Sequence, residues 1–286
     1  MRKISAGVLP LTAVAAVLAT GFLTARVQRK GQVMNEESKA ISTAGIKNFT
    51  ITVIYDNNPY KEGLETAWGF SALIVGAEKT ILFDTGGNGS ILLGNMEKLA
   101  IDPQSVDLVV LSHIHGDHTG GLDGFLEKNS KITVYLPKSF PAKFKDNVQG
   151  YGVKTVEVEQ SLKICENVYS TGQLGRLIKE QALIVRTERG LVVITGCAHP
   201  GIVKIVNAAK ELLSDDIFLV MGGFHLEWAT AGKVEKIISA FKEAGVRYVG
   251  PCHCSGDKAR SLFEKHFGEN YINIGAGKVV GVADLQ

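Results

Sequence analysis

Four side chains within the short stretch 112–121 could bind a metal ion; they are His113, His115, Asp117 and His118. The apolar run 108–111 before them is typical of a buried strand, and Gly120 and Gly121 begin a turn after them. A strand end that breaks into a tight loop can direct all four side chains to one point. Imidazole and carboxylate groups bind zinc, and also iron or manganese. The alternative, a solvated loop that is merely rich in His, does not explain this spacing.

Two ions could share this cluster. His113 and His115 would hold one ion, and Asp117 and His118 would hold the other. A bound ion lowers the pKa of its water towards ~7 and polarises a phosphoryl or carbonyl oxygen. The stretch therefore predicts metal-assisted chemistry.

Three later segments also place a His directly after an apolar run: GCAHPG (196–201), MGGFHL (221–226) and GPCHCSG (250–256). We interpret His199 as a metal ligand, and Cys197 beside it as either a ligand or a small buried residue. His225 could ligate a metal, but we favour a role in substrate binding or proton transfer for it. His253 lies between two Cys, but no second Cys pair exists, which argues against a closed structural zinc site.

Six of the seven His of the chain follow apolar runs in this way. The exception is His266, which falls on a predicted helix face. Ends of several strands that carry the same kind of side chain predict one polar pocket, and a catalytic centre explains that pattern best.

The elements that position these residues can be read from apolar periodicity. Strands are predicted over 49–55, 70–75, 80–83, 108–111, 132–136, 155–164, 180–185, 190–194, 217–221 and 246–249. Helices are predicted over 91–99, 122–128, 139–148, 202–213, 234–244 and 258–267. Grouped strands followed by strand–helix alternation, repeated in two halves, predict an α/β (α+β) fold with two sheets packed together and helices outside.

The motif His113-x-His115-x-Asp117-His118 after an apolar strand resembles the signature of the metallo-β-lactamase superfamily. The segment LFDTG (82–86) is similar to the first motif of that superfamily, in which an Asp at a strand end braces the metal loop. The remaining motifs resemble the subfamily that includes the dihydropterin–ribofuranosylaminobenzene 5'-phosphate synthases and related metal-dependent hydrolases. The resemblance runs from about residue 48 to the C-terminus, and it implies an αββα sandwich of two mixed β-sheets with outer helices.

The resemblance also implies a set of site residues. Two divalent ions, zinc first and iron or manganese as alternatives, would be held by His113, His115, Asp117, His118, His199 and His253. The expected catalytic residues are Asp84, Asp117 and His225, with Asp84 orienting a metal ligand from behind. The superfamily commonly places an acidic residue that bridges two metals near 197, where this chain has Cys197. This departure puts the bridged geometry in question.

Bulk properties restrict the partners. The 286 residues are 45% hydrophobic and 21% charged, with a net charge of +2, which is ordinary for a globular enzyme and argues against a nucleic-acid partner. Four Cys, two of them flanking His253, do not make a disulfide framework. We expect one domain over 47–286 that acts on a small, phosphorylated substrate; the oligomeric state stays open.

Residues 1–27 form a separate hydrophobic segment, and the polar stretch 28–46 reads as a linker. Arg2 and Lys3 precede an uncharged run, 4–25, that is long enough to span a bilayer. This length favours an uncleaved membrane anchor over a signal peptide, with a buried helix third. Positive charge is balanced on both flanks, so the orientation is open. We expect a membrane-anchored or exported protein rather than a cytoplasmic one.

The function predicted from these observations is a metal-dependent hydrolase that acts on a phosphoester or related ester. A transferase that resembles the dihydropterin synthases and releases pyrophosphate is the alternative, since both reactions need metals beside phosphate. A non-catalytic metal or redox binding protein is a third hypothesis, because Cys197, Cys252 and Cys254 lie near the expected site.

Overall fold

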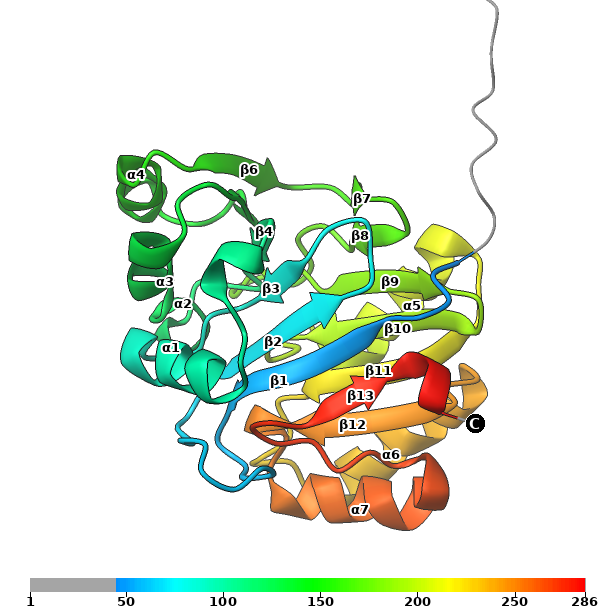
Figure 1. Cartoon of the computed structure of the whole chain (residues 1–286). Helices are drawn as coiled ribbons and strands as arrows, with labels where there is room; N and C mark the ends of the chain where they lie inside the picture. Colours follow the sequence, from blue (N-terminus) through cyan, green and yellow to red (C-terminus); the bar gives the residue numbers. More distant parts are fainter. Residues whose placement is uncertain (1–44, 286) are drawn as a thin grey trace, which may run out of the picture. The chain divides into compact units, whose positions relative to one another are not determined.

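A computed structural model describes residues 45–285 of the chain and shows two β-sheets (Figure 1). The first sheet has seven strands in the order β13-β1-β2-β3-β4-β5-β6. Their bounds are β1 (Thr50–Asp56), β2 (Phe70–Val75), β3 (Ile81–Phe83), β4 (Leu108–Val110), β5 (Thr133–Pro137), β6 (Lys154–Val158) and β13 (Val279–Gly281). Strands β3 to β6 run parallel to one another, whereas β13, β1, β2 and β3 pair in antiparallel fashion, so this sheet is mixed.

The second sheet has six strands in the order β12-β11-β10-β9-β8-β7. Their bounds are β7 (Leu162–Cys165), β8 (Val168–Ser170), β9 (Leu183–Thr187), β10 (Gly190–Thr195), β11 (Ile217–Gly223) and β12 (Tyr248–Cys252). Strands β10, β11 and β12 are parallel, and the other pairs are antiparallel. This sheet is therefore mixed as well.

The two sheets pack face to face, and helices cover their outer faces (Figure 1). Helices α1 (Gly89–Lys98), α3 (Leu122–Lys128) and α4 (Ala142–Gly150) pack on the first sheet, and α5 (Ile202–Leu213), α6 (Ala231–Glu243) and α7 (Asp257–Phe267) pack on the second. The short helix α2 (Gly116–Thr119) lies in the loop after β4. The predicted αββα sandwich is confirmed.

Side-chain alternation explains why the strands read as continuous apolar runs. On β3, Ile81 and Phe83 face the other sheet, while Leu82 packs under the helices. On β10, Val192 and Ile194 face inward and Val193 faces outward. Because successive side chains of a strand point to opposite faces, a strand in the middle layers of a sandwich must be apolar on both sides.

Three strand predictions were wrong in their bounds, one of them the strand predicted over 246–249, which is β12 (Tyr248–Cys252). The single strand predicted over 155–164 is two strands, β6 and β7, that belong to different sheets. The polar residues 159–161 form the crossing between the sheets. Gly172 packs so closely against the backbone of Gln160 that there is no space for a Cβ on residue 172. The strand predicted from 180 begins at Leu183, because Glu180 and Gln181 are buried polar residues that bond to the loops of the candidate site.

The expected N-terminal segment 1–27 and residues 28–44 of the expected linker lie outside the described residues. Within 45–285, no helix has the length and apolar character needed to cross a bilayer. The predicted anchor, the linker and the localisation stay predictions.

Candidate metal centre

The predicted site residues come together where strands of both sheets end. Asp84 follows β3, and the stretch 112–118 follows β4, its parallel neighbour. Cys197, His225 and His253 follow the parallel strands β10, β11 and β12. Because parallel neighbours end at the same edge of a sheet, each sheet gathers its loops at one end.

Three imidazoles form the first cluster. The Nδ1 atom of His115 lies 3.1 Å from Nε2 of His113 and 3.2 Å from Nε2 of His199. In a tetrahedral zinc site with Zn–N bonds near 2.05 Å, ligand nitrogens are roughly 3.3 Å apart, so this spacing fits one ion. The donor set also fits, because imidazole suits zinc, iron and manganese.

Two imidazoles of this cluster, those of His113 and His199, are held in the form that binds metal. Burial, followed by the neighbouring His118 and His199 rings, lowers the pKa of His113 well below its ordinary value. Burial and the nearby His225 and His115 rings lower the pKa of His199 to about 4. A neutral imidazole keeps a free lone pair, so both rings can act as ligands near neutral pH.

Asp117, His118, Cys197 and His253 form the second cluster. The Sγ atom of Cys197 lies 3.2 Å from Nε2 of His118 and 3.4 Å from Nε2 of His253. The Oδ2 atom of Asp117 lies 3.2 Å from Nε2 of His253 and 3.5 Å from Nε2 of His118. A carboxylate, two imidazoles and a sulfur thus converge, which suits a borderline-soft ion such as zinc.

Charge within the second cluster is concentrated on buried groups. Burial opposes ionisation of Asp117, but hydrogen bonds from His118 and His253 lower the pKa of its carboxyl far below the ordinary value. Burial likewise disfavours the charged ring of His118, yet the carboxylates of Asp84 and Asp117 raise its pKa to about 10. Negative charge fixed around a deeply buried imidazole is the environment that a cation would favour.

Three of the cluster imidazoles, those of His113, His118 and His253, are each oriented by a partner on the second ring nitrogen. Nδ1 of His118 donates to Oδ2 of Asp84 at 2.7 Å. The hydroxyl of Ser112 donates to the same carboxylate and therefore accepts from Nδ1 of His113 at 2.8 Å. Nδ1 of His253 donates to Oδ1 of Asn57 at 2.9 Å. These bonds leave the Nε2 atoms of all three rings facing the clusters.

Glu180 holds the turn that carries Cys197 and His199. Its buried carboxylate accepts hydrogen bonds from the backbone N–H groups of Cys197, Ala198 and His199, at 2.8–2.9 Å. Burial raises the pKa of Glu180 to about 7, against the effect of those bonds. Sequence reasoning missed Glu180 and Asn57, because each is a single polar residue whose partner is distant in the chain. The only feature of the sequence that pointed to Glu180 was a polar Glu-Gln pair at the start of an otherwise apolar predicted strand.

The backbone of the site is strained in a consistent way. Asp84, Ala198, His225 and His253 all have φ between 48° and 59°, although none is glycine. Non-glycine residues adopt this left-handed conformation at a cost, and such residues gather at functional sites. The loops after β3, β10, β11 and β12 therefore each turn sharply where a site residue is presented.

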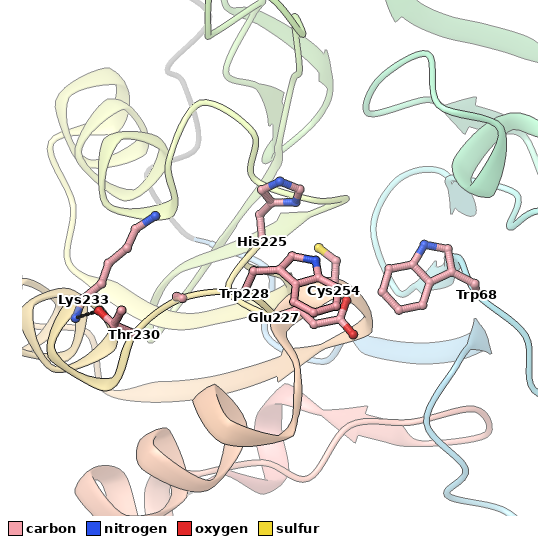
Figure 2. Close-up of a pocket in the computed structure, with 8 residues that line it drawn as sticks. Trp68, His225, Glu227, Trp228, Thr230, Lys233 and Cys254 are labelled. Atoms are coloured by element: carbon pink, nitrogen blue, oxygen red, sulfur yellow. Dashed lines mark hydrogen bonds between the residues drawn. The ribbon is translucent and has the colours of Figure 1, made fainter.

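A cavity of about 370 Å³ adjoins the clusters. Figure 2 shows His225 and Cys254 on one side of it, Trp228 and Glu227 in front of them, and Trp68 opposite. Trp68 is 48% exposed and its ring centroid lies 4.8 Å from that of His253, while Trp228 is 91% exposed. This volume suits a small molecule, and the exposed indoles offer flat apolar surfaces to it.

The structure thus brings together all eight predicted site residues. Seven of them lie in the two clusters or, for Asp84, directly behind one. His225 lies beside the first cluster, with its ring centroid 4.4 Å from that of His199, and is exposed at the cavity wall. Cys197, which falls near where the resemblance implies a bridging acid, is 4% exposed and lies between His118 and His253.

Comparison with known proteins supports this description. Residues 69–209 match the family model described as the metallo-beta-lactamase superfamily. A synthase from Methanocaldococcus jannaschii, named 7,8-dihydropterin-6-methyl-4-(beta-D-ribofuranosyl)-aminobenzene-5'-phosphate synthase, is 29% identical over 82% of this chain and 96% of its own length. The solved structure of Tm1679, described as a metal-dependent hydrolase of the beta-lactamase superfamily, is 33% identical, covers 82% of this chain and 100% of its own, and superposes with a TM-score of 0.70. The Bacillus subtilis protein YhfI, 18% identical, covers 82% of this chain and 99% of its own and shares the fold with a TM-score of 0.62.

Proposed function

Because the chain belongs to the metallo-β-lactamase superfamily, we propose that it is a metal-dependent hydrolase that cleaves a phosphoester or related ester of a small molecule. The observation that carries the proposal is the convergence of the two ligand clusters beside an open cavity. A structural metal site would be closed, whereas these clusters lie next to a space that a small molecule can enter.

In this proposal each cluster holds one divalent ion. His113, His115 and His199 hold the first, and Asp117, His118, Cys197 and His253 hold the second. Zinc is the first choice for both, with iron or manganese as alternatives. When bound, such ions polarise a phosphoryl or carbonyl oxygen and acidify water.

The protein residues supply orientation and contacts to the substrate. Asp84, Ser112 and Asn57 fix the imidazoles so that their Nε2 atoms face the reacting centre. Trp68 and Trp228 provide apolar walls for the substrate. His225 faces the cavity, and its hydrogen bond with Cys254 raises the pKa of its imidazole. A charged imidazole there can donate a hydrogen bond or proton to an oxygen of the ester.

The test is hydrolysis of phosphoesters by the full chain after reconstitution with zinc or manganese. Bis(p-nitrophenyl) phosphate and p-nitrophenyl phosphate serve as probes, with His115→Ala as the variant and His266→Ala as its control. We expect p-nitrophenolate release that falls by more than about 100-fold in His115→Ala, because the first cluster loses a ligand, and that is unchanged in His266→Ala. A reconstituted chain that cleaves neither these esters nor a carboxylic ester would contradict the proposal.

A transferase is the second candidate, and the similarity to the Methanocaldococcus jannaschii synthase is the observation that favours it. In that case the chain would join a dihydropterin-methyl diphosphate to ribofuranosylaminobenzene 5'-phosphate and release pyrophosphate. The indole walls of the cavity also suit a planar ring. Pyrophosphate release that requires both substrates, with no hydrolysis of either alone, would replace the hydrolase proposal.

A further inference from the structure

Three adjacent parallel strands of the second sheet each present a soft or borderline metal ligand at the same offset. Cys197 lies two residues after the end of β10, His225 two residues after β11, and Cys254 two residues after β12. The register pairs Thr195 with Gly222, and Gly223 with Cys252. His225 and Cys254 therefore leave the sheet at the same level, and Cys197 leaves it within one residue of that level.

This placement brings their ligand atoms together. The two Sγ atoms and a ring nitrogen of His225 all lie within 4.8 Å of one another. Both sulfurs are buried, because Cys197 and Cys254 are each 4% exposed, whereas His225 is exposed. Two of these residues, His225 and Cys254, belong to neither cluster described above. Two sulfurs and an imidazole thus form a distinct donor set that shares only Cys197 with the second cluster.

The backbone around the three ligands is built to hold them. N–H groups of Leu226 and Glu227 donate to the carbonyl oxygen of Cys254 at 3.0 and 3.2 Å, which ties the loop after β11 to the loop after β12. A Cβ on Gly223 would lie 2.7 Å from Sγ of Cys254, so glycine leaves the space that the sulfur occupies. The position of Cys254 is therefore set by the backbone and does not depend on a flexible side chain.

We propose that Cys197, His225 and Cys254 form a third metal site, which takes one thiophilic ion such as zinc or copper(I). Thiolate and imidazole ligands together select ions of this class. The cavity lined by His225 and Cys254 is the route by which the ion enters (Figure 2). The Cys197 thiolate can bridge this ion to the one in the second cluster, since a thiolate sulfur has more than one lone pair.

Binding at this site has a consequence for the cavity. His225 lies in the cavity wall, and an ion on one ring nitrogen occupies its lone pair, so that nitrogen can no longer carry a proton for the substrate. The ion and a substrate that contacts His225 therefore exclude one another. A third equivalent of zinc is expected to raise the KM of the enzyme reaction, whereas the first two equivalents support activity.

Metal binding itself is the test, and it needs no activity. The full chain, kept reduced, is loaded with excess zinc, desalted, and analysed for zinc per chain; a parallel sample is loaded with cobalt(II) and its sulfur-to-cobalt absorption is recorded. The variants are Cys254→Ser and His225→Ala, and the matched controls are Cys165→Ser, which changes a Cys remote from the three ligands, and His266→Ala. His225→Ala is included because the ring of His225 is exposed, so its removal does not disturb the core.

We expect three zinc equivalents in the parent and both controls, and two in each variant. The cobalt absorption should fall by about half in Cys254→Ser, since one of two thiolate ligands is removed. A parent with two equivalents, or variants that keep three with unchanged absorption, would overturn the third site. His115→Ala separates this proposal from the proposed function, because it should lose one ion and hydrolysis yet keep the sulfur-to-cobalt absorption of the parent.

Discussion

At the scale of single residues, the site depends on side chains that stand behind the ligands. Asp84 accepts three hydrogen bonds from the loop after β4, from Nδ1 of His118 and from the backbone N–H and hydroxyl of Ser112. Its carboxylate fixes the ring of His118 directly and, through Ser112, that of His113. A single buried carboxylate therefore orients one ligand in each cluster.

Replacing Asp84 by Asn tests this role without straining the backbone. Asp84 has φ of 56°, a conformation that Asn tolerates well. The amide keeps the shape of the side chain but lacks the charge that pairs with His118. We expect zinc affinity of the second cluster to fall by ~10- to 100-fold while the fold is retained. Titration against a chromophoric chelator measures the affinity, and an unchanged value in Asp84→Asn would mean that the loop alone orients His118.

Glu180→Gln tests the turn that carries Cys197 and His199. A Gln side chain has one acceptor oxygen, so it cannot accept from all three N–H groups that Glu180 binds. The buried group left without an acceptor should destabilise the chain by about 1–3 kcal/mol. Urea unfolding measures this loss, with the exposed Glu188→Gln as the control. Equal stability of the two variants would show that the turn does not need the carboxylate of Glu180.

At the scale of elements, close packing at the end of β10 brings the two halves of the site together. A Cβ on Gly196 would lie 2.1 Å from Oγ of Ser112 and 2.9 Å from Oδ2 of Asp84. The loop after β10 can approach the loop after β4 only because residue 196 is glycine. A Cβ added to Gly94, within α1, would have nothing within 4 Å, so Gly94 is a glycine that the packing does not require.

Gly196→Ala should therefore destabilise the chain by about 1–3 kcal/mol and weaken zinc binding, because the new methyl group pushes Ser112 and Asp84 away. Gly94→Ala should instead stabilise it by about 0.5–1 kcal/mol, since Ala favours a helix interior. Paired thermal unfolding measurements compare the two variants. A tolerated Gly196→Ala would mean that the two loops can separate without loss of the site.

The elements could be predicted wherever burial leaves a local signature. Continuous apolar runs such as Leu108–Leu111 predict strands buried on both faces, and His at their ends predicts where the site lies. The crossing between β6 and β7 could not be predicted, because the alternation of residues 155–164 continues across the turn. The partners of Glu180 and Asn57 could not be predicted either, since hydrogen bonds to residues far away in the chain leave no periodic pattern. The fold was therefore more predictable than the residues that support the ligands.

At the scale of the whole molecule, the ligands come from both sheets. In the first cluster His113 and His115 belong to the loop after β4, and His199 belongs to the loop after β10. An ion bound there links the two sheets at one end of the sandwich. Because the unfolded chain cannot assemble these ligands, binding stabilises the folded state.

Metal removal should therefore lower the thermal stability of the full chain. Zinc at about 100 times its dissociation constant stabilises by about 2.7 kcal/mol per independent site. We expect the unfolding midpoint to fall when a chelator is added and to recover when zinc is restored, as measured by calorimetry. The chelator should have a smaller effect on His115→Ala, and an identical effect would show that the first cluster does not bind the ion.

The pairing of β13 with β1 has a consequence for the synthesis of the chain. Val279–Gly281 covers the outer edge of Thr50–Thr52, so β1 is completed by a strand that is made much later than β1 itself. His253 also lies late in the chain, after most of both sheets. While the nascent chain grows, β1 therefore presents an open edge to other chains, and the second cluster lacks one of its ligands, His253. The covered edge of β1 and the full ligand set of the second cluster therefore both depend on segments that are synthesised long after β1.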